Sequence, residues 1–530
     1  MITPVLIVGG GPVGLALAIE LGWRGVSCTL LEQGDGSIID AKMFATGIRT
    51  VELCRRWGIA GRVRNWGFPR DFPFDNVFVT TLAGYELARL PMPSIADTPP
   101  IAQSPENFAH CPQFVFDRIL AERARSFPSV SIRYGARLVD FEEKEDHVIA
   151  RLESGDLLKT KYLVGCDGYS STVRKQLGIA MQGDEHLNRA INIMFRTHAL
   201  SLLHDKGNAG RYVAIGTDGP WASLTAADGR EQWRLMVYQD DLKPEEAVRR
   251  AVGRDFPFEV LTVGVWARRN LLAERYRNGR VFLAGDAVHV MPPNGGLGMN
   301  TGIGDAADLG WKLAAMHQGW GGEKLLDSYE AERRPAGARA CQEAMTNFER
   351  ITPRRHFPAI HEDSPAGTRT RAELGERLSK SMRSAWDNPL NTHLGYRYEG
   401  SPVCIADGAL PPEPEDSRVY VQTSHPGCRA PHAWLADGRS TLDLFGRGFA
   451  LLCFQSSQEN FSGKANSVPL EVISIDDPAV AELYERKLVL VRPDGHVAWR
   501  GDAAPTDAGA VLNHARGAAN AVILEEEDAS

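Results

Sequence analysis

A glycine-rich segment near the start of the chain has the spacing needed to hold a diphosphate. Gly9, Gly11 and Gly14 form a GxGxxG pattern, and Glu32 follows 23 residues after Gly9. The first glycine permits a tight turn, the second lets the backbone approach a pyrophosphate, and the third lets a helix pack closely on a strand. An acidic residue at this offset binds ribose hydroxyls. The pattern predicts a dinucleotide site and leaves NAD and FAD both open.

The flanking residues predict the elements that would position this motif. Residues 5–8 are apolar and β-branched, which is typical of a buried parallel strand. Residues 15–25 then favour a helix, and residues 27–31 favour a second strand that ends at Glu32. A strand, a glycine-rich turn and a helix in this order would place the helix N-terminus against the negative charge of a phosphate.

Three further segments could carry chemistry. Residues 162–174 run from an apolar strand into Asp167-Gly168, and residues 280–287 run from another apolar strand into Gly285-Asp286. Residues 292–300, with two prolines followed by a glycine-rich stretch, come next and precede a long apolar-patterned helix. The free N–H groups at the start of that helix could stabilise negative charge on a bound ring.

With these motifs in the same order, the sequence resembles the class A flavoprotein aromatic hydroxylases over roughly residues 1–350. The likeness is closer to the larger members with a C-terminal extension, such as the hydroxyphenylpropionate and resorcinol hydroxylases. The resemblance implies FAD as the cofactor, NADPH or NADH as a transient reductant, and O2 with a small aromatic substrate as the other reactants. It implies hydroxylation of a phenolic ring through a flavin C4a-hydroperoxide.

Carried onto this chain, the resemblance implies a set of residues that hold the cofactor. These residues are Gly9, Gly11, Pro12, Gly14, Glu32, Gln33, Lys42, Arg49, Gln113, Asp167, Gly168, Gly285, Asp286, Pro292, Gly296, Gly298, Met299 and Asn300. Lys42 stands where many relatives have an arginine. A point charge there replaces a bidentate guanidinium, which weakens the expected clamp on the pyrophosphate.

The residues that would act on the substrate are less well defined by the pattern. His289 and Pro293 are the candidate catalytic residues, because both lie within the flavin motif. Tyr212, Trp221 and Tyr238 are candidate substrate contacts on a predicted antiparallel sheet. A base that ionises the phenol would lower the barrier. Phe44 stands where phenol hydroxylase has an aspartate, so the resemblance implies either a different base or a substrate that ionises through water. The candidate bases are His289, Tyr212, Tyr238 and His110.

The predicted fold class is α/β, with a Rossmann-like FAD-binding domain, an inserted antiparallel-sheet substrate domain and a C-terminal thioredoxin-like domain. The predicted boundaries are 1–181 for the first part of the FAD-binding domain, 182–272 for the substrate domain, 273–350 for the return of the FAD-binding domain, 351–400 for a helical linker and 401–530 for the thioredoxin-like domain. This last segment has no CxxC, so disulfide exchange is not expected.

Composition narrows the remaining possibilities. The 530 residues carry 59 basic and 67 acidic side chains, a net charge of −8, which disfavours nucleic acid and anionic membranes as partners. The eight cysteines show no metal-ligand spacing, so no metal site is predicted. An uncharged run at residues 3–19 is interrupted at its centre by Gly9-Gly10-Gly11-Pro12, which argues against a membrane span. We expect a cytoplasmic monomer or homodimer.

Three alternatives remain open from the sequence. The same architecture could oxygenate a polyketide or other polycyclic substrate. The chain could also be a flavin-dependent dehydrogenase or reductase without oxygen insertion, or a flavin-binding sensor without catalytic activity.

Overall fold

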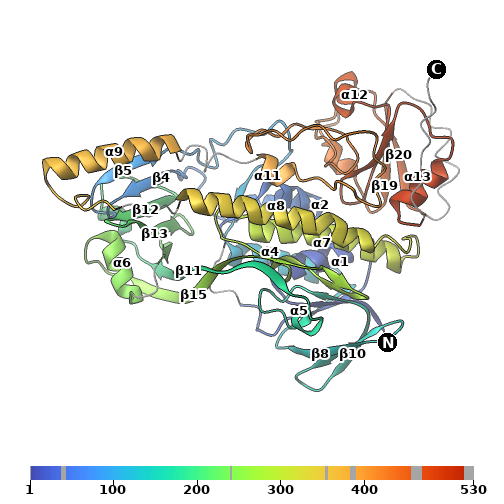
Figure 1. Cartoon of the computed structure of the whole chain (residues 1–530), viewed down its shortest axis with the longest axis horizontal. Coiled ribbons are helices and arrows are strands. Elements are labelled where there is room, and N and C mark those ends of the chain that lie inside the picture. The colour runs from blue at the N-terminus through green and yellow to red at the C-terminus, as the bar shows by residue number, and fades with distance from the viewer. Residues whose placement is uncertain are drawn as a thin grey trace.

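The computed structural model describes residues 2–37, 43–238, 242–351, 356–381, 390–454 and 468–518. They form two large sheets and a smaller C-terminal sheet, joined by long helices (Figure 1). Within these ranges no helix is both long and apolar enough to cross a membrane.

The first sheet carries the glycine-rich motif. Its strand order is β16 (Arg277–Asn278), β17 (Val281–Leu283), β10 (Leu157–Gly165), β1 (Thr3–Val8), β2 (Cys28–Leu31) and β7 (Val130–Arg133), with the hairpin β8 (Leu138–Glu143) and β9 (Val148–Leu152) attached to β10. Strands β17, β10, β1, β2 and β7 are parallel to one another, whereas β16 pairs antiparallel with β17 and β9 pairs antiparallel with β10. Residues Val5–Val8 are buried, as expected for a central parallel strand covered on both faces.

Helices cover this sheet and connect it to the rest of the molecule. They are α1 (Pro12–Trp23), α2 (Ile48–Arg56), α3 (Ala60–Arg64), α4 (Gln113–Arg125), α5 (Thr172–Gln176), α7 (Leu297–His317) and α8 (Asp327–Ile351). The two longest, α7 and α8, run side by side across the middle of the molecule (Figure 1). The 3-10 turn η2 (Gly285–Ala287) joins β17 to β18 (His289–Val290).

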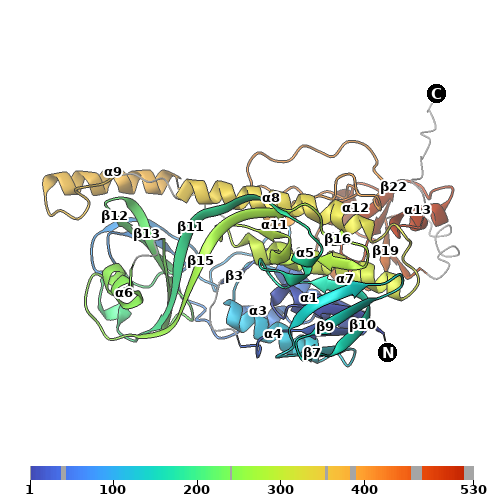
Figure 2. The same ribbon diagram turned by 60° about the horizontal axis from the view of Figure 1, so that its bottom comes forward.

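The second sheet is mostly antiparallel. Its order is β18, β15 (Glu259–Ala273), β11 (Met181–Arg196), β14 (Gln232–Val237), β13 (Gly219–Ala226), β12 (Arg211–Gly216), β4 (Asn76–Val79) and β5 (Glu86–Leu90). The long strands β11 and β15 bridge the two halves of the molecule, and α6 (Pro244–Val252) and η1 (Leu200–Leu202) lie at their far end (Figure 2). Strands β4 and β5 belong to this sheet although they precede residue 181.

A helical connection leads to the C-terminal domain. It contains α9 (Pro365–Ser381), beside β5, and α11 (Leu390–Leu394), beside α2. The C-terminal sheet has the order β20 (Leu470–Ser474), β19 (Phe449–Cys453), β21 (Leu488–Val491) and β22 (Val497–Gly501). Helices α12 (Pro478–Tyr484) and α13 (Ala508–Ala515) pack with it, preceded by the 3-10 turn η3 (Thr441–Leu444). The short pair β3 (Ala45–Thr46) and β6 (Ala109–His110) borders the cavity described below.

Candidate active site

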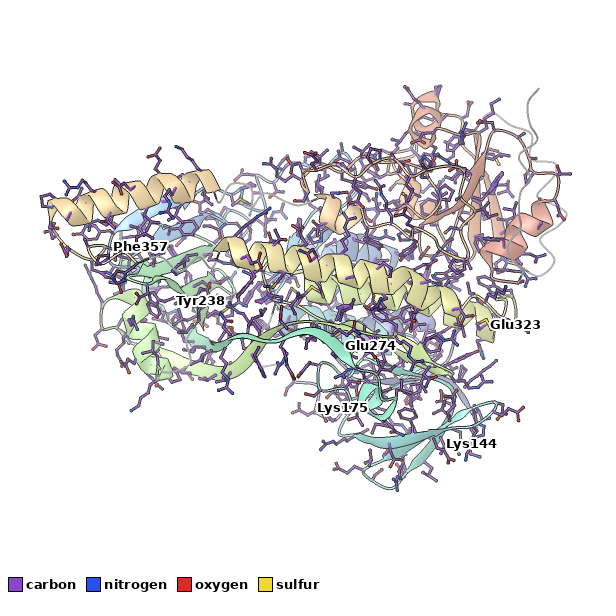
Figure 3. The ribbon with its side chains drawn as sticks, in the orientation of Figure 1. Lys144, Lys175, Tyr238, Glu274, Glu323 and Phe357 are labelled. Carbon is purple, nitrogen blue, oxygen red and sulfur yellow. The ribbon has the colours of Figure 1, made fainter. Side chains whose placement is uncertain are left out.

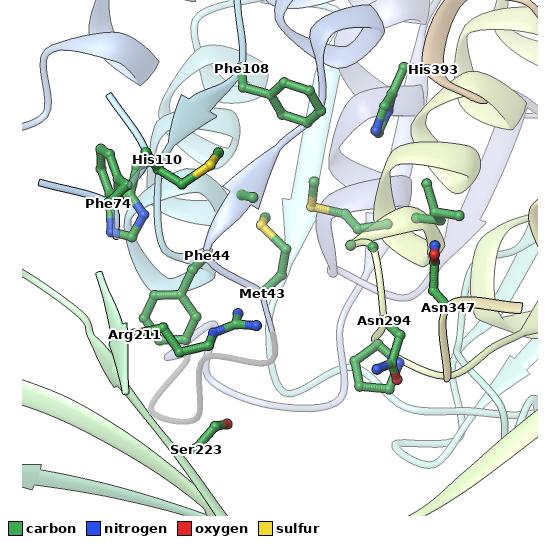
Figure 4. Close-up of a pocket in the computed structure, with 18 of the residues that line it drawn as sticks. Met43, Phe44, Phe74, Phe108, His110, Arg211, Ser223, Asn294, Asn347 and His393 are labelled. Carbon is green, nitrogen blue, oxygen red and sulfur yellow. The ribbon is translucent and has the colours of Figure 1, made fainter. Parts of the chain in front are cut away.

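One cavity of about 1430 Å³ connects the glycine-rich motif with the second sheet. Its lining includes Gly11 of the motif, Ser223 of the second sheet and residues 292–299. Figure 4 shows Asn294 of this last segment and Ser223 on different sides of the cavity. A single small-molecule site has about 300–1,000 Å³. The cavity is therefore large enough for two ligands, a cofactor beside the motifs and a substrate beside the sheet.

The three glycines of the first motif have separate roles in the structure. A Cβ on Gly9 would collide with the carbonyl oxygen of Cys166, and a Cβ on Gly14 would collide with that of Gly9. A Cβ on Gly11, in contrast, would meet nothing within 4 Å. Gly9 and Gly14 thus allow close packing, whereas Gly11 and Pro12 border open space at the α1 N-terminus. This turn fits a pyrophosphate.

Glu32 is held over the glycine-rich turn by backbone donors. Its two oxygens accept hydrogen bonds from the N–H of Gly10 and of Gly34, each at 2.7 Å. The neighbouring Gln33 is exposed. The carboxylate is thus fixed at the end of β2, the position at which the acidic residue of this motif binds ribose hydroxyls.

Asp167 and Gly168 have different surroundings, because the Asp167 side chain bonds to α5 whereas Gly168 lines the cavity. The Asp167 carboxylate accepts hydrogen bonds from the Ser171 hydroxyl (2.5 Å) and from the N–H groups of Thr172 (2.7 Å) and Val173 (3.2 Å). Burial raises the pKa of Asp167 from its ordinary value in spite of these bonds. Asp167 therefore caps α5, and Gly168 is the residue of this pair that lines the cavity.

The Gly285-Asp286 turn presents its aspartate to the cavity. Asp286 is exposed and lines the cavity, while the Gly285 N–H donates to Asp305 at 3.1 Å. Asp305 also accepts from His289 Nε2 and Arg333 Nε, both at 2.8 Å. This buried aspartate holds the turn in place.

The assignment of His289 as a catalytic residue is corrected by this arrangement. Its side chain has no exposed surface, because β18 pairs with β15 and turns the imidazole toward Asp305. His289 is thus a buried support behind the turn. Pro293, the other candidate, lines the cavity next to Pro292.

The start of α7 faces the same cavity. Gly296, Gly298 and Met299 line it, and the N-cap Gly296, at φ 66°, offers no side-chain cap. Asn300 does not share that lining. Its Oδ1 accepts from the Gly47 N–H (2.8 Å) and the Thr50 hydroxyl (2.7 Å), so it ties α7 to α2. The first N–H groups of α7 are available to a ligand.

Two other predicted cofactor residues differ in placement, and a third lies outside the described residues. Gln113 lines the cavity at the start of α4. Arg49 is corrected, because its guanidinium donates to Glu52 (2.9 Å) and to the carbonyl of Asp494 (2.7 Å) in the interface with the C-terminal domain. Lys42 lies outside the described residues.

The second sheet contributes a wall of arginines that the sequence analysis missed. Arg211, Arg234 and Arg268 line the cavity from β12, β14 and β15. Thr225 of β13 pairs with both Arg211 and Arg234, so these two lie on one face about 10 Å apart. An arginine inside the apolar run of β14 was the signal that could have identified this wall.

The electrostatic environment of this wall is unusual for arginines. Burial lowers the pKa of Arg211 and of Arg268, with the phenol of Tyr238 acting in the opposite direction. The guanidinium carbon of Arg268 lies 4.7 Å from the Tyr238 ring centroid, and that of Arg234 lies 4.4 Å from the Phe44 ring centroid. The wall presents positive charge between aromatic rings.

Of the three predicted substrate contacts, Tyr238 alone lines the cavity, at the second-sheet end of the molecule (Figure 3). Tyr212 follows Arg211 on β12, so its side chain lies on the opposite face of the sheet and packs in the core there. Its hydroxyl donates to the Gly207 carbonyl. Trp221 falls in a β-bulge and packs in the same core, under Arg250. Both assignments as substrate contacts are therefore corrected.

Two histidines, the partly buried His110 and the buried His393, also line the cavity. Burial, with a contribution from the charge of Arg234, lowers the pKa of His110 to about 4, and burial lowers that of His393 to about 4. Both imidazoles are neutral near pH 7. His110 is therefore suited to hydrogen bonding, and its low pKa makes it a weak base for a phenol.

Comparisons with known proteins agree with this geometry. Residues 2–344 match the FAD binding domain family, and residues 423–519 match the C-terminal domain of aromatic-ring hydroxylases. The chain is 32% identical to the FAD-dependent monooxygenase apdD of Emericella nidulans, over 94% of this chain and 87% of the relative. It is also 32% identical to 4-methyl-5-nitrocatechol 5-monooxygenase of a Burkholderia species, over 97% and 96%.

A solved structure supports the same conclusion. The rebeccamycin biosynthetic enzyme RebC with reduced flavin superposes with a TM-score of 0.91 at 41% identity, covering 98% of this chain and 99% of the other. The chain therefore belongs to the FAD-dependent monooxygenases of the class A aromatic hydroxylase type. FAD is its cofactor, and the Rossmann-like domain, antiparallel sheet and C-terminal thioredoxin-like domain are those of the family.

Proposed function

We propose that this protein uses NAD(P)H and O2 to hydroxylate a phenolic aromatic compound of more than one ring, whose ionised oxygen faces Arg211, Arg234 and Arg268. The observation that carries the proposal is the single cavity that contains both the cofactor motifs and this arginine wall. Bound FAD supplies the exchange of two electrons with NAD(P)H and the activation of O2.

The cofactor end of the cavity supports this proposal through its backbone. We propose that Gly11, Pro12 and Glu32 hold the ADP half of FAD and that Asp286 and Gln113 hold the chain between the rings. The remaining proposed contacts are Gly168, Gly285, Pro292, Gly296, Gly298 and Met299. The positive end of the α7 dipole then faces the place where negative charge develops on reduction.

The substrate end supports a proposal about activation. Neither His110 nor His393 is suited to deprotonate a phenol near pH 7, because burial lowers the pKa of each imidazole to about 4. Positive charge in a buried site favours the ionised form of a neighbouring acid. The arginine wall would thus lower the pKa of the bound phenol and leave its proton to pass to water.

The walls of the cavity support exclusion of bulk water. Pro292 and Pro293 present no N–H donor, and apolar side chains such as Phe74 and Phe108 border the space opposite the loop (Figure 4). A site closed to water protects a reactive oxygen species from unproductive decay.

The extent of the cavity supports a substrate with more than one ring. Its lining extends from the α7 start to Arg350 on α8 and to Leu374 and Arg377 on α9. The relative from a Burkholderia species is named for a nitrocatechol, which is a single-ring phenol. Names of relatives therefore do not decide the ring count, and the extent of the cavity favours the larger class.

The test is a screen of phenols with one to four rings, each with and without a carboxylate. The purified FAD-loaded protein is mixed with NADH or NADPH, and pyridine nucleotide oxidation and oxygen uptake are followed together, with catalase to reveal peroxide. We expect multi-ring acidic phenols to accelerate both rates with little peroxide. Acceleration by single-ring phenols alone would overturn the size class, and nucleotide oxidation without oxygen uptake would favour a dehydrogenase.

A further inference from the structure

A histidine outside the recognised motifs reaches the cofactor end of the cavity. His393 lies on α11, in the connection to the C-terminal domain, and is only 5% exposed. It lines the cavity and packs edge to face with Phe108, with ring centroids 4.7 Å apart. Figure 4 shows its imidazole pointing from α11 toward the interior of the cavity.

The Nε2 atom of this histidine has no hydrogen-bond partner among the described residues, although it is buried. A buried polar atom left without a partner costs about 1–3 kcal/mol. Because burial keeps the imidazole neutral, it can offer a hydrogen bond without adding a charge. A polar group of a ligand in the cavity would satisfy this atom.

The neighbours of His393 identify which ligand this is. A Cβ added to Gly47 would lie 2.7 Å from His393 Nδ1 and 3.1 Å from Asn300 Cγ. The imidazole therefore sits beside the first turns of α2 and α7, which Asn300 ties together. Gly296, whose carbonyl accepts from the Asn300 amide at 2.6 Å, opens the helix that faces the cofactor. The arginine wall lies on the second sheet, away from this corner.

We propose that His393 hydrogen-bonds the polar edge of the bound flavin ring through Nε2 and stabilises the reduced flavin more than the oxidised flavin. The physical reason is that reduction adds negative charge to the ring, and a fixed N–H donor in a buried site gains strength with that charge. The inference rests on FAD binding alone and is independent of the substrate class proposed above.

The experiment compares two variants of the FAD-loaded protein. His393→Phe keeps an aromatic ring and removes the donor, whereas His393→Gln keeps an N–H donor at a similar distance from the backbone. His514→Phe, in the C-terminal helix α13, is the matched control for removing a buried histidine. The readouts are the dissociation constant of FAD for apo-protein and the two-electron reduction potential of the bound flavin.

We expect His393→Phe to weaken binding of reduced flavin about tenfold more than that of oxidised flavin. For a two-electron couple this corresponds to a potential about 30 mV more negative. His393→Gln should restore most of the difference, and His514→Phe should leave the potential unchanged. An unchanged potential in His393→Phe would overturn the proposal, as would an equal shift in the Phe and Gln variants. A rise in the KM for substrate alone would assign the contact to the substrate and also overturn it.

Discussion

Buried arginines at the interface between domains and on the cavity wall have different partners. At the interface between the FAD-binding and C-terminal domains, Arg492 contacts Asp308 (3.0 Å), Glu332 (2.5 Å) and Asp494 (2.7 Å). On the cavity wall, Arg268 donates to the sulfur of Met236 at 3.0 Å and stacks over Tyr238. The first arginine is surrounded by fixed anions, and the second by soft, neutral groups.

This difference distinguishes a charge that the fold neutralises from the charge that we propose acts on the substrate. Burial lowers the pKa of Arg492, but the charges of Asp494 and Glu332 outweigh burial and raise it well above its ordinary value. Burial instead sets the direction for Arg268, whose pKa is lowered. The interface thus supplies counter-charges to Arg492, whereas the printed contacts of Arg268 are with the neutral side chains of Met236 and Tyr238.

The largest expected effect is at the interface. Arg492→Met removes the cation and leaves Glu332 and Asp308 buried around Lys312 alone. Breaking a buried ion pair from one side costs about 3–5 kcal/mol. We expect the free energy of unfolding to fall by about this amount, measured by denaturant titration. The exposed pair Arg486–Asp502 provides the control, and Arg486→Met should cost no more than about 1 kcal/mol. Equal losses in both variants would contradict the comparison.

The second effect is at the wall. Arg268→Met keeps an apolar stem of similar length and removes the charge. Hydrogen bonds to charged groups contribute about 1.5–3 kcal/mol, so we expect kcat/KM for an acidic phenol to fall roughly 10- to 150-fold. Stability should change little, because the wild-type charge is itself disfavoured by burial. The same loss with a neutral substrate of equal size would show that Arg268 acts through packing.

The third prediction concerns the cofactor end. Asp286→Ala removes the one exposed carboxylate of the turn that faces the cavity. We expect the affinity for FAD to fall about tenfold, or about 1.4 kcal/mol, as measured by fluorescence titration of the apo-protein. Asp156→Ala, on an exposed turn, is the control and should bind FAD normally. Unchanged FAD affinity in Asp286→Ala would refute this role.

The smallest effect is a shared dependence on pH. Burial lowers the pKa of His496 at the interface to about 4, as it does for His393 in the cavity. Their unfolded value is about 6.5, so the unfolded chain binds more protons between these values and stability is lost as the pH falls from 6.5 toward 4. At pH 6 each of the two histidines lowers the free energy of unfolding by less than about 1 kcal/mol relative to neutral pH. Thermal unfolding at pH 7.5, 6 and 5 should show this decline, and a rise in stability on acidification would contradict it.

The features predicted correctly from the sequence, the glycine-rich turn and the FAD-binding fold, depend mostly on residues that are close together in the chain. The roles of Gly9, Gly11 and Gly14 depend on a strand, a turn and a helix that are consecutive in the chain, so spacing was sufficient to place them. The order of the motifs likewise indicated the FAD-binding fold. Long-range pairing was not accessible in this way.

His289 and Arg49 illustrate that limit. His289 lies in a flavin motif, yet its direction is set by pairing of β18 with β15 and by Asp305. Arg49 lies on α2, yet its partner is the carbonyl of Asp494, 445 residues away in the hairpin of another domain. Neither contact leaves a periodic signal near the residue that makes it.

The sequence also did not show which face of the second sheet lines the cavity. Alternation along a strand shows which residues share a face, but it does not show which face meets a ligand. Tyr212 and Arg211 are adjacent, and pairing of β12 with β13 and β4 decides that the arginine lines the cavity. Aromatic residue type suggested Tyr212, whereas the structure selects its neighbour.

The proposed oxygenation is tested most directly by following the oxygen atom itself. The FAD-loaded protein, NAD(P)H and an acidic multi-ring phenol that stimulates nucleotide oxidation are incubated under ¹⁸O2, and the product is analysed by mass spectrometry. We predict that one labelled atom enters the aromatic product for each nucleotide oxidised. A product without label, or labelled hydrogen peroxide as the main fate of the oxygen, would contradict a monooxygenase whose arginine wall holds its substrate.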